Sequence, residues 1–328
     1  MVRVQHPAII AAFLLCLGST SVLQKKEESW DTFDGVQEAK RSDESGFGVV
    51  IESNDGRTTT LSADEVNKII KDACGSDLSK SSIIQRDPDE SHDEGDATPA
   101  VSPRSLSGPR VINPSGYPYS ACGRFDGNNG YSCSVTLVGP RLAVTANHCN
   151  QGKAGNSDFG KVYPALYDTK GTYARVDRWL RSKAFSAEAD DAEVFDIAVL
   201  VLDRDIGHDF GWMDVASRVE DDWTGKTWFQ NVAYTDAKDD MKKPVYQEGI
   251  SFKRGNLRNG AGPLHSDALG YGGSDGSSLW YYRGGRGVIV GVASTLDNRN
   301  LVFAGQVGVA PSELTRLVTV AQSKIPLS

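Results

Sequence analysis

The sequence lacks several features that would place it in common functional classes. It has only five histidines, and they do not have the spacing of metal ligands. No glycine-rich loop lies between a strand and a helix as a phosphate-binding loop would. The net charge is −8, which gives no reason to expect nucleic acid or an anionic membrane as a partner. We therefore expect no metal, no cofactor and no nucleic-acid ligand.

Long hydrophobic runs are also missing, with one short exception near the start. Residues 8–17 form an apolar run of about ten residues, the length of a signal-peptide core and too short to span a bilayer. Arg3 precedes this run, and Ser19 and Ser21 supply the small residues of a cleavage site. The pattern predicts a signal peptide over residues 1–21 and a secreted, extracellular protein that has no membrane anchor in its mature form. A buried N-terminal helix is the alternative.

Acidic residues are concentrated in one region. Residues 22–100 hold 19 acidic and 9 basic side chains, a net charge of −10, so the rest of the chain is close to neutral. Such asymmetry is typical of a tail or pro-segment attached to a folded domain. Within it, residues 46–74 predict a hairpin that turns at residues 54–56, followed by a helix capped by Ser62 and Glu65. We therefore predict a pro-segment over residues 22–110, with a small folded module near 46–75 and a flexible linker.

The pattern changes at Val111, where short strand-like runs separated by Gly, Asn and Asp begin. This spacing predicts an all-β domain over residues 111–328. The final stretch predicts a C-terminal helix capped by Ser312. Many strands before one closing helix is the order expected of two packed six-stranded antiparallel β-barrels. The runs lie at residues 131–139, 141–146, 162–167, 196–203, 226–234, 286–294 and 301–310.

Three motifs in this domain carry candidate chemistry. The segment TANHC places His148 directly after an apolar strand, where it could act as a general base. Asp196 begins a continuous apolar run 48 residues later. Burying a carboxylate at the start of such a strand costs free energy unless another group pairs with it. The third motif, DALGYGGSDGSSLWYY, spans residues 267–282 and has a glycine-rich centre. A lone turn histidine and a strand-end aspartate are the alternative interpretations of the first two motifs.

Together these motifs resemble the chymotrypsin/trypsin-like serine proteases, closest to the glutamyl-endopeptidase-like branch, over roughly residues 111–317. The resemblance implies that His148 is the general base and that Asp196 orients it. It also implies a disulfide between Cys133 and Cys149, and an oxyanion hole at Gly272 and Gly273. An ungapped alignment places Asp275, and not a serine, at the nucleophile position.

A carboxylate at this position has no proton for a general base to remove. If it attacked a peptide bond, the tetrahedral adduct would expel the carboxylate again, because it is a better leaving group than the amine. Asp275 is expected to hold His148 as an imidazolium, which predicts a non-catalytic protein-binding homologue, or pseudoprotease. The alternative is an active secreted endopeptidase, made as a zymogen, with Ser274 as nucleophile. Its oxyanion donors would then be its own N–H and that of Gly272. Either way we expect a monomer whose partner is a protein or peptide.

Other positions qualify the resemblance. Ala293 stands where glutamyl endopeptidases carry a substrate-binding histidine, and Leu269 stands where trypsin-like enzymes carry aspartate. Neither specificity is therefore predicted, and His265 is expected to be structural or exposed. The Arg110–Val111 bond looks like an activation cleavage site, with an ordinary linker as the alternative. Since Cys16 lies in the signal peptide, a Cys74–Cys122 disulfide is the remaining pairing, unless both thiols are free.

Overall fold

The computed structural model describes residues 47–74, 105–128, 130–150, 158–168, 171–185, 192–237, 239–255, 262–305 and 312–324. All of them belong to one compact unit, which extends from Arg41 to Ser328. The predicted signal peptide and most of the acidic segment lie outside the described residues. No helix among the described residues is both long and apolar enough to cross a membrane.

The described elements are mostly strands. The helices are α1 (Ala63–Cys74), α2 (Ala192–Phe195), α3 (Gly207–Phe210) and α4 (Glu313–Lys324). The strands are β1 (Val49–Ser53), β2 (Thr58–Leu61), β3 (Arg110–Val111), β4 (Cys122–Asp126), β5 (Ser132–Gly139), β6 (Leu142–Thr145), β7 (Lys161–Pro164), β8 (Ala174–Ser182), β9 (Ala198–Leu202), β10 (Asp214–Val215), β11 (Phe229–Tyr234), β12 (Pro244–Ile250), β13 (Phe252–Arg254), β14 (Leu264–Leu269), β15 (Ser278–Arg283), β16 (Arg286–Asp297) and β17 (Asn300–Ala304).

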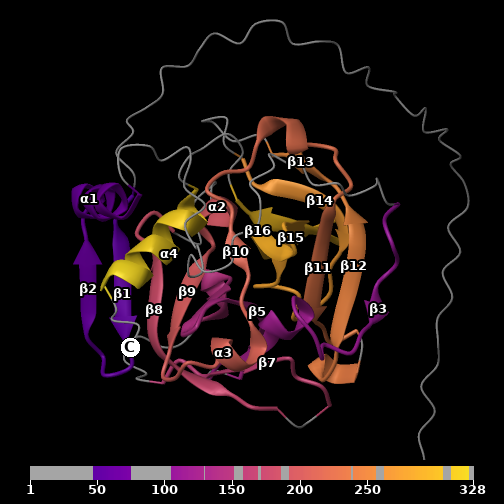
Figure 1. Cartoon of the computed structure of the whole chain (residues 1–328), viewed down its shortest axis with the longest axis horizontal. Coiled ribbons are helices and arrows are strands. Elements are labelled where there is room, and N and C mark those ends of the chain that lie inside the picture. The colour runs from indigo at the N-terminus through magenta and orange to yellow at the C-terminus, as the bar shows by residue number, and fades with distance from the viewer. Residues whose placement is uncertain are drawn as a thin grey trace, which may run out of the picture. The chain divides into compact units, whose positions relative to one another are not determined.

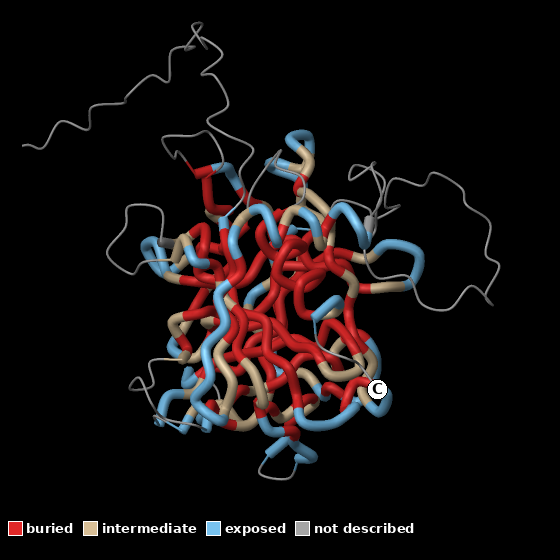
Figure 2. Tube along the Cα trace, turned by 90° about the vertical axis from the view of Figure 1, so that its left-hand side faces the viewer, coloured by how far each residue is buried: buried red, intermediate tan, exposed pale blue. Residues whose placement is uncertain are grey.

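The first sheet closes into a six-stranded antiparallel barrel. Its strands follow the order β8-β7-β4-β5-β6-β9, and β9 pairs with β8 to close the ring. The strands β5, β6 and β9 are almost entirely buried, because they consist largely of Val, Leu and Ala side chains that fill the interior. The tube in Figure 2 shows buried residues through the centre of the molecule and exposed ones in the peripheral turns.

The second sheet has the order β13-β14-β17-β16-β15-β11-β12-β3. Only Ser251 separates β12 from β13, so the chain itself links these two distant positions of the strand order. A second core cluster lies here and includes Phe229, Phe252 and Phe303. The short strand β3 pairs with the outer edge of β12, and Figure 1 shows it beside that strand.

The predicted hairpin and helix of residues 46–74 are present as β1, β2 and α1. Ser62 caps α1 through a capping box, since its hydroxyl accepts the N–H of Glu65 at 3.3 Å and the Glu65 carboxylate accepts the N–H of Ser62 at 2.8 Å. The hairpin extends the barrel sheet, because β1 pairs with β8. Figure 1 shows β2, β1 and β8 side by side, with α1 and α4 close by.

The predicted C-terminal helix is also present. The N–H of Thr315 donates to the Ser312 hydroxyl at 3.3 Å, which confirms the N-cap. Most of α4 is buried. It packs against β8, β9 and α1, and therefore joins the barrel to the N-terminal hairpin and helix.

The predicted Cys74–Cys122 disulfide is wrong. Cys122 is a free thiol at the start of β4, only 1 % exposed within the core of the barrel. Burial raises the pKa of this thiol to about 12. The Cys122 thiol is enclosed by the barrel, whereas α1, the helix that ends at Cys74, packs on α4. The prediction paired these two cysteines only because the other cysteines were already assigned.

Candidate active site

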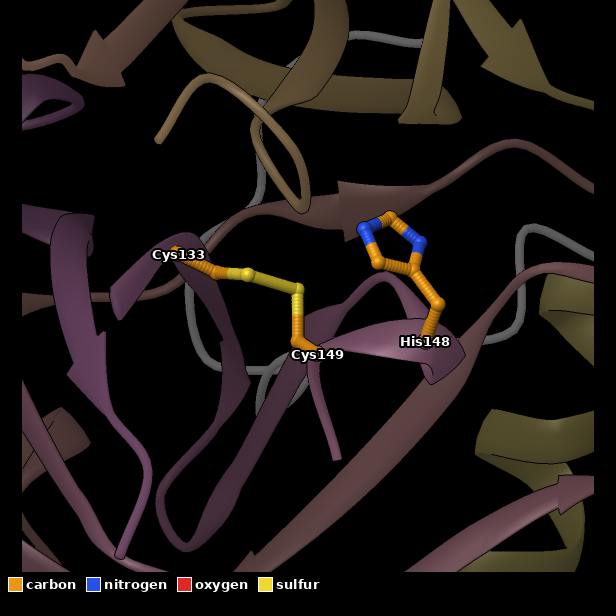
Figure 3. Close-up of side chains that lie close together, drawn as sticks. All are labelled: Cys133, His148 and Cys149. Atoms are coloured by element: carbon orange, nitrogen blue, oxygen red, sulfur yellow. A yellow bond between two sulfur atoms is a disulfide. The ribbon is translucent and has the colours of Figure 1, made fainter. Parts of the chain in front are cut away.

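His148 lies in a one-turn helix, Asn147–Cys149, directly after β6. The disulfide between Cys133 and Cys149 is present as predicted and ties this turn to β5. Figure 3 shows His148 and Cys149 projecting from the same turn, with the disulfide on one side of it. The cross-link restricts the movement of the element that carries the imidazole.

The sulfur atoms of this disulfide and a ring nitrogen of His148 lie within 4.8 Å of one another. The two sulfurs are bonded to each other, so they are not available as thiolate ligands for a metal ion. The proximity is a consequence of the cross-link beside the histidine.

Asp196 contacts His148 as expected. Its carboxylate accepts the Nδ1 proton of His148 at 2.6 Å and the backbone N–H of the same residue at 2.8 Å. Asp196 is 3 % exposed and stands just before β9, the strand that pairs with β6. These two contacts fix the ring orientation and keep a proton on Nδ1.

Ser294 completes the hydrogen bonding of Asp196, a contact that the sequence analysis missed. Its hydroxyl donates to Asp196 Oδ2 at 2.6 Å and reaches it from β16 in the second sheet. The signal in the sequence was present, because Ser294 follows the aligned Ala293 directly. The position of Ser294 in the sequence does not predict that its side chain faces the first barrel.

Asn147 stands directly before His148 in the same one-turn helix. Its Oδ1 accepts the indole N–H of Trp179 at 2.9 Å, and both side chains are buried. Trp179 lies on β8. This hydrogen bond therefore connects the histidine turn to another strand of the barrel.

The glycine-rich motif forms the tight turn between β14 and β15. Gly273 and Gly276 have φ values of +86° and +83°, which favour glycine. A Cβ on Gly276 would collide with Thr145 Oγ1 and the carbonyl oxygen of Ser134. The carbonyl oxygen of Asp275 in turn accepts the N–H of Ser134 at 2.8 Å. The turn is thus pressed against the first barrel, beside His148.

Asp275 occupies the place opposite the imidazole. Its Oδ2 lies 3.5 Å from Nε2 of His148, and its side chain is 32 % exposed. His148 is therefore placed between two carboxylates. Burial opposes its charged form, but the contacts with Asp196 and Asp275 outweigh this effect and raise the pKa of His148 to about 10. At neutral pH the ring is an imidazolium with no lone pair on Nε2.

The neighbouring serines point elsewhere. The hydroxyl of Ser274 accepts the N–H of Tyr271 at 3.0 Å, and Ser274 is 1 % exposed. Ser277 accepts a hydrogen bond from the side chain of Asn231, and Ser278 donates to Thr136. All three hydroxyls are engaged inside the protein.

No protein-family profile matches the chain, and no curated protein matches its sequence. Among solved structures, a "Glu endopeptidase in complex with MPD" matches with a TM-score of 0.52 and 21 % identity, over 66 % of this chain and 97 % of that one. The chain has a chymotrypsin-like fold. The predicted fold class is thereby confirmed.

Two further structures match less closely. Protease Anisep from Arthrobacter nicotinovorans gives a TM-score of 0.45 at 15 % identity, over 61 % of this chain and 94 % of that one. A thermostable serine protease, AL20, gives 0.41 at 17 % identity, over 57 % and 91 %.

The structure also places three other residues that the sequence comparison singled out, Leu269, His265 and Gly272. The backbone of Leu269 is held by Gln247, which donates to its carbonyl oxygen at 2.7 Å and accepts its N–H at 3.0 Å. His265 lies 3.5 Å from Asp297 with its side chain 39 % exposed, at the surface as expected. Gly272 accepts the N–H of Asp236 through its carbonyl oxygen at 2.9 Å. The oxyanion role of Gly272 and Gly273 stays a prediction.

The proposed cleavage bond lies within a paired strand. Arg110 and Val111 form β3 and pair with Tyr246 and Val245 of β12. The Arg110 guanidinium contacts the carboxylate of Glu248 at 3.0 Å. Cleavage between Arg110 and Val111 stays a prediction, and it would require this strand to separate from β12.

Proposed function

We propose that this chain is a secreted, non-catalytic protein-binding homologue of the chymotrypsin-fold serine proteases. The observation that carries the proposal is the pair formed by His148 Nε2 and Asp275 Oδ2. In a protease of this fold, Nε2 takes a proton from the nucleophile. Here that nitrogen carries a proton at neutral pH and faces a group that has none to give.

The position of Ser274 argues against the alternative, an active endopeptidase. A nucleophilic hydroxyl must come within hydrogen-bond reach of its general base. The Ser274 hydroxyl is instead turned toward the backbone of Tyr271 and is buried. Shifting the register to bring it to His148 would break this contact and displace Asp275 from the imidazole.

A protein or peptide partner is supported by β16. This strand pairs with β15 only as far as Val292, although it continues to Asp297. Among the described strands, residues 295–297 pair with β17 alone. A strand edge of this kind can accept an extended peptide as an added strand. Binding of this type needs no nucleophile.

Labelling with a fluorophosphonate, which reacts with activated serines, tests the absence of catalysis. We expect no labelling of the purified full-length chain and gain of labelling in Asp275→Ser, which restores a hydroxyl opposite His148. The double variant Asp275→Ser/His148→Ala should lose that labelling, and Asp275→Asn is the matched control with neither hydroxyl nor charge.

Labelling of the unmodified chain that disappears in Ser274→Ala would overturn the proposal in favour of an active enzyme. Secretion is tested separately, by N-terminal sequencing of protein exported from a eukaryotic host. The mature chain is expected to begin at Val22.

A further inference from the structure

The outer edge of β8 binds the N-terminal hairpin. Residues 178–181 of β8 pair with β9 on one side and with β1 on the other, while β7 pairs only with the start of β8 at residues 174–175. Five residues of β1 pair in register with residues 178–182. Without β1 this edge would present a row of unpaired backbone groups at the closing strand of the barrel.

The helix α1 adds an apolar contact. Val66 is fully buried and Ile70 is 2 % exposed, and both belong to the same core cluster as Leu314 and Leu317 of α4. The two helices therefore bury one continuous apolar surface. Large apolar side chains such as Val66 and Ile70 are stabilised by burial, which favours α1 staying on the apolar face of α4.

A buried guanidinium links the two parts. Arg316 of α4 is 8 % exposed and donates to Oδ1 of Asn67 and to the carbonyl oxygen of Phe47, both at 3.1 Å. Its Nε also lies 3.4 Å from the buried carboxylate of Glu313. A buried charge is costly unless it is paired and hydrogen-bonded. Loss of residues 47–74 would remove both hydrogen-bond acceptors outside α4.

The same hairpin and helix adjoin the candidate site. Phe47 contacts the ring of Phe195, the residue before Asp196, edge to face at 4.7 Å. On the strand side, Glu52 of β1 lies opposite Trp179, whose indole N–H is bonded to Asn147 beside His148. The N-terminal segment thus contacts the residue before Asp196 directly, and it pairs with the strand residue whose side chain is bonded to Asn147.

We propose that residues 47–74 are a permanent, non-covalently held part of this fold and not a removable pro-segment. The surface formed by the outer edge of β8, by α4 and by Phe195 accepts them as one added hairpin and one helix. After cleavage anywhere between α1 and β4, including the Arg110–Val111 bond, the protein is a tightly bound two-fragment complex. This inference does not depend on whether the site is catalytic.

The test cuts the full-length protein after it has folded. Residues 88–94 are replaced by the recognition sequence of a site-specific protease, in a Cys74→Ser background so that no disulfide involving position 74 can hold the fragments together. After cleavage we expect both fragments to co-elute in size-exclusion chromatography with light scattering, at the mass of the uncut monomer. Release of the small fragment in native buffer would overturn the proposal.

Matched variants locate the contact. Val66→Asp places a charge in the buried face of α1, and the cleaved fragments are expected to separate. Lys71→Asp introduces an aspartate on the exposed face of the same helix, and the fragments should stay together. Equal behaviour of these two variants would contradict the assigned interface.

Arg316→Met is a milder change that keeps the apolar bulk of the side chain. It should speed dissociation of the cleaved small fragment by about tenfold, as the loss of hydrogen bonds to a buried charged group implies. A rate unchanged from that of the cleaved parent would show that the buried link does not hold the fragments. This rate remains measurable even if Val66→Asp fails to fold.

Discussion

Two carboxylates reach the imidazole of His148 from different halves of the molecule, and their surroundings differ. Asp196 comes from the first barrel, is 3 % exposed and accepts three hydrogen bonds, two from His148 and one from Ser294. Asp275 comes from the turn before β15, has a side chain 32 % exposed and lies 3.5 Å from Nε2. The comparison shows that His148 lies between one buried, fully hydrogen-bonded carboxylate and one partly exposed carboxylate that lies farther from the ring.

The largest expected effect is a difference in stability between variants that remove one carboxylate or the other. Asp196→Asn should lower the free energy of unfolding by about 3 kcal/mol, because it removes one partner of a buried, hydrogen-bonded pair. Asp275→Asn should lower it by less than about 1 kcal/mol, since solvent screens this more exposed pair. Urea denaturation followed by circular dichroism measures both. Equal losses would mean that the two carboxylates are not distinguished by burial.

A smaller effect is expected at Asn147, on the barrel side of the site. Asn147→Ala leaves the buried indole N–H of Trp179 without its acceptor, which should cost about 1–3 kcal/mol. Trp179→Phe removes the donor as well, so the double variant should be less destabilised than the sum of the two single changes. Additive losses in this cycle would show that the hydrogen bond contributes nothing.

The smallest expected effect is on the pKa of His148 and comes from Asp275, the carboxylate in the turn before β15. The pKa of His148 is raised from its ordinary value of 6.5 to about 10 by its two carboxylates. Its ion pairs therefore stabilise the fold fully below pH 6.5, and this contribution is lost as the pH rises through 10. Asp275→Asn should lower the pKa of His148, because it removes one of the two carboxylates beside the ring, and the loss of stability should then begin at lower pH.

NMR titration of labelled histidine measures this pKa directly, with His265 as an exposed reference in the same spectra. A pKa of His148 that is the same in Asp275→Asn and in the unmodified chain would show that the turn carboxylate does not act on the ring.

The sequence predicted many elements of the fold because their side chains follow simple rules. The apolar runs at β5, β6, β9 and β16 are buried strands, and the Ser62–Glu65 pair is a local cap. The strands β8, β12 and β14 were missed, because polar and charged residues interrupt their apolar pattern. In β8 the charged residues include Arg178 and Arg181, although this strand pairs with three others.

The candidate site was predictable to the same extent. His148, Asp196 and the disulfide each lie in a local motif, whereas Ser294, Gln247 and the Trp179–Asn147 contact join segments distant in sequence. The Cys74–Cys122 pairing failed for the same reason. Counting cysteines tells nothing about which layer of a barrel encloses each thiol.

By itself, the sequence determined that His148, Asp196 and Asp275 are present and that the domain around them is rich in β-strands. Those facts depend on residue identity and local order. Only the tertiary structure decided that Asp275 faces Nε2 while the Ser274 hydroxyl turns inward, and that β1 and β2 extend the sheet of the first barrel while α1 packs on α4. The physical reason is that the charge of His148 and the pairing partners of β8 depend on groups that lie far apart along the chain. Folding brings these groups together.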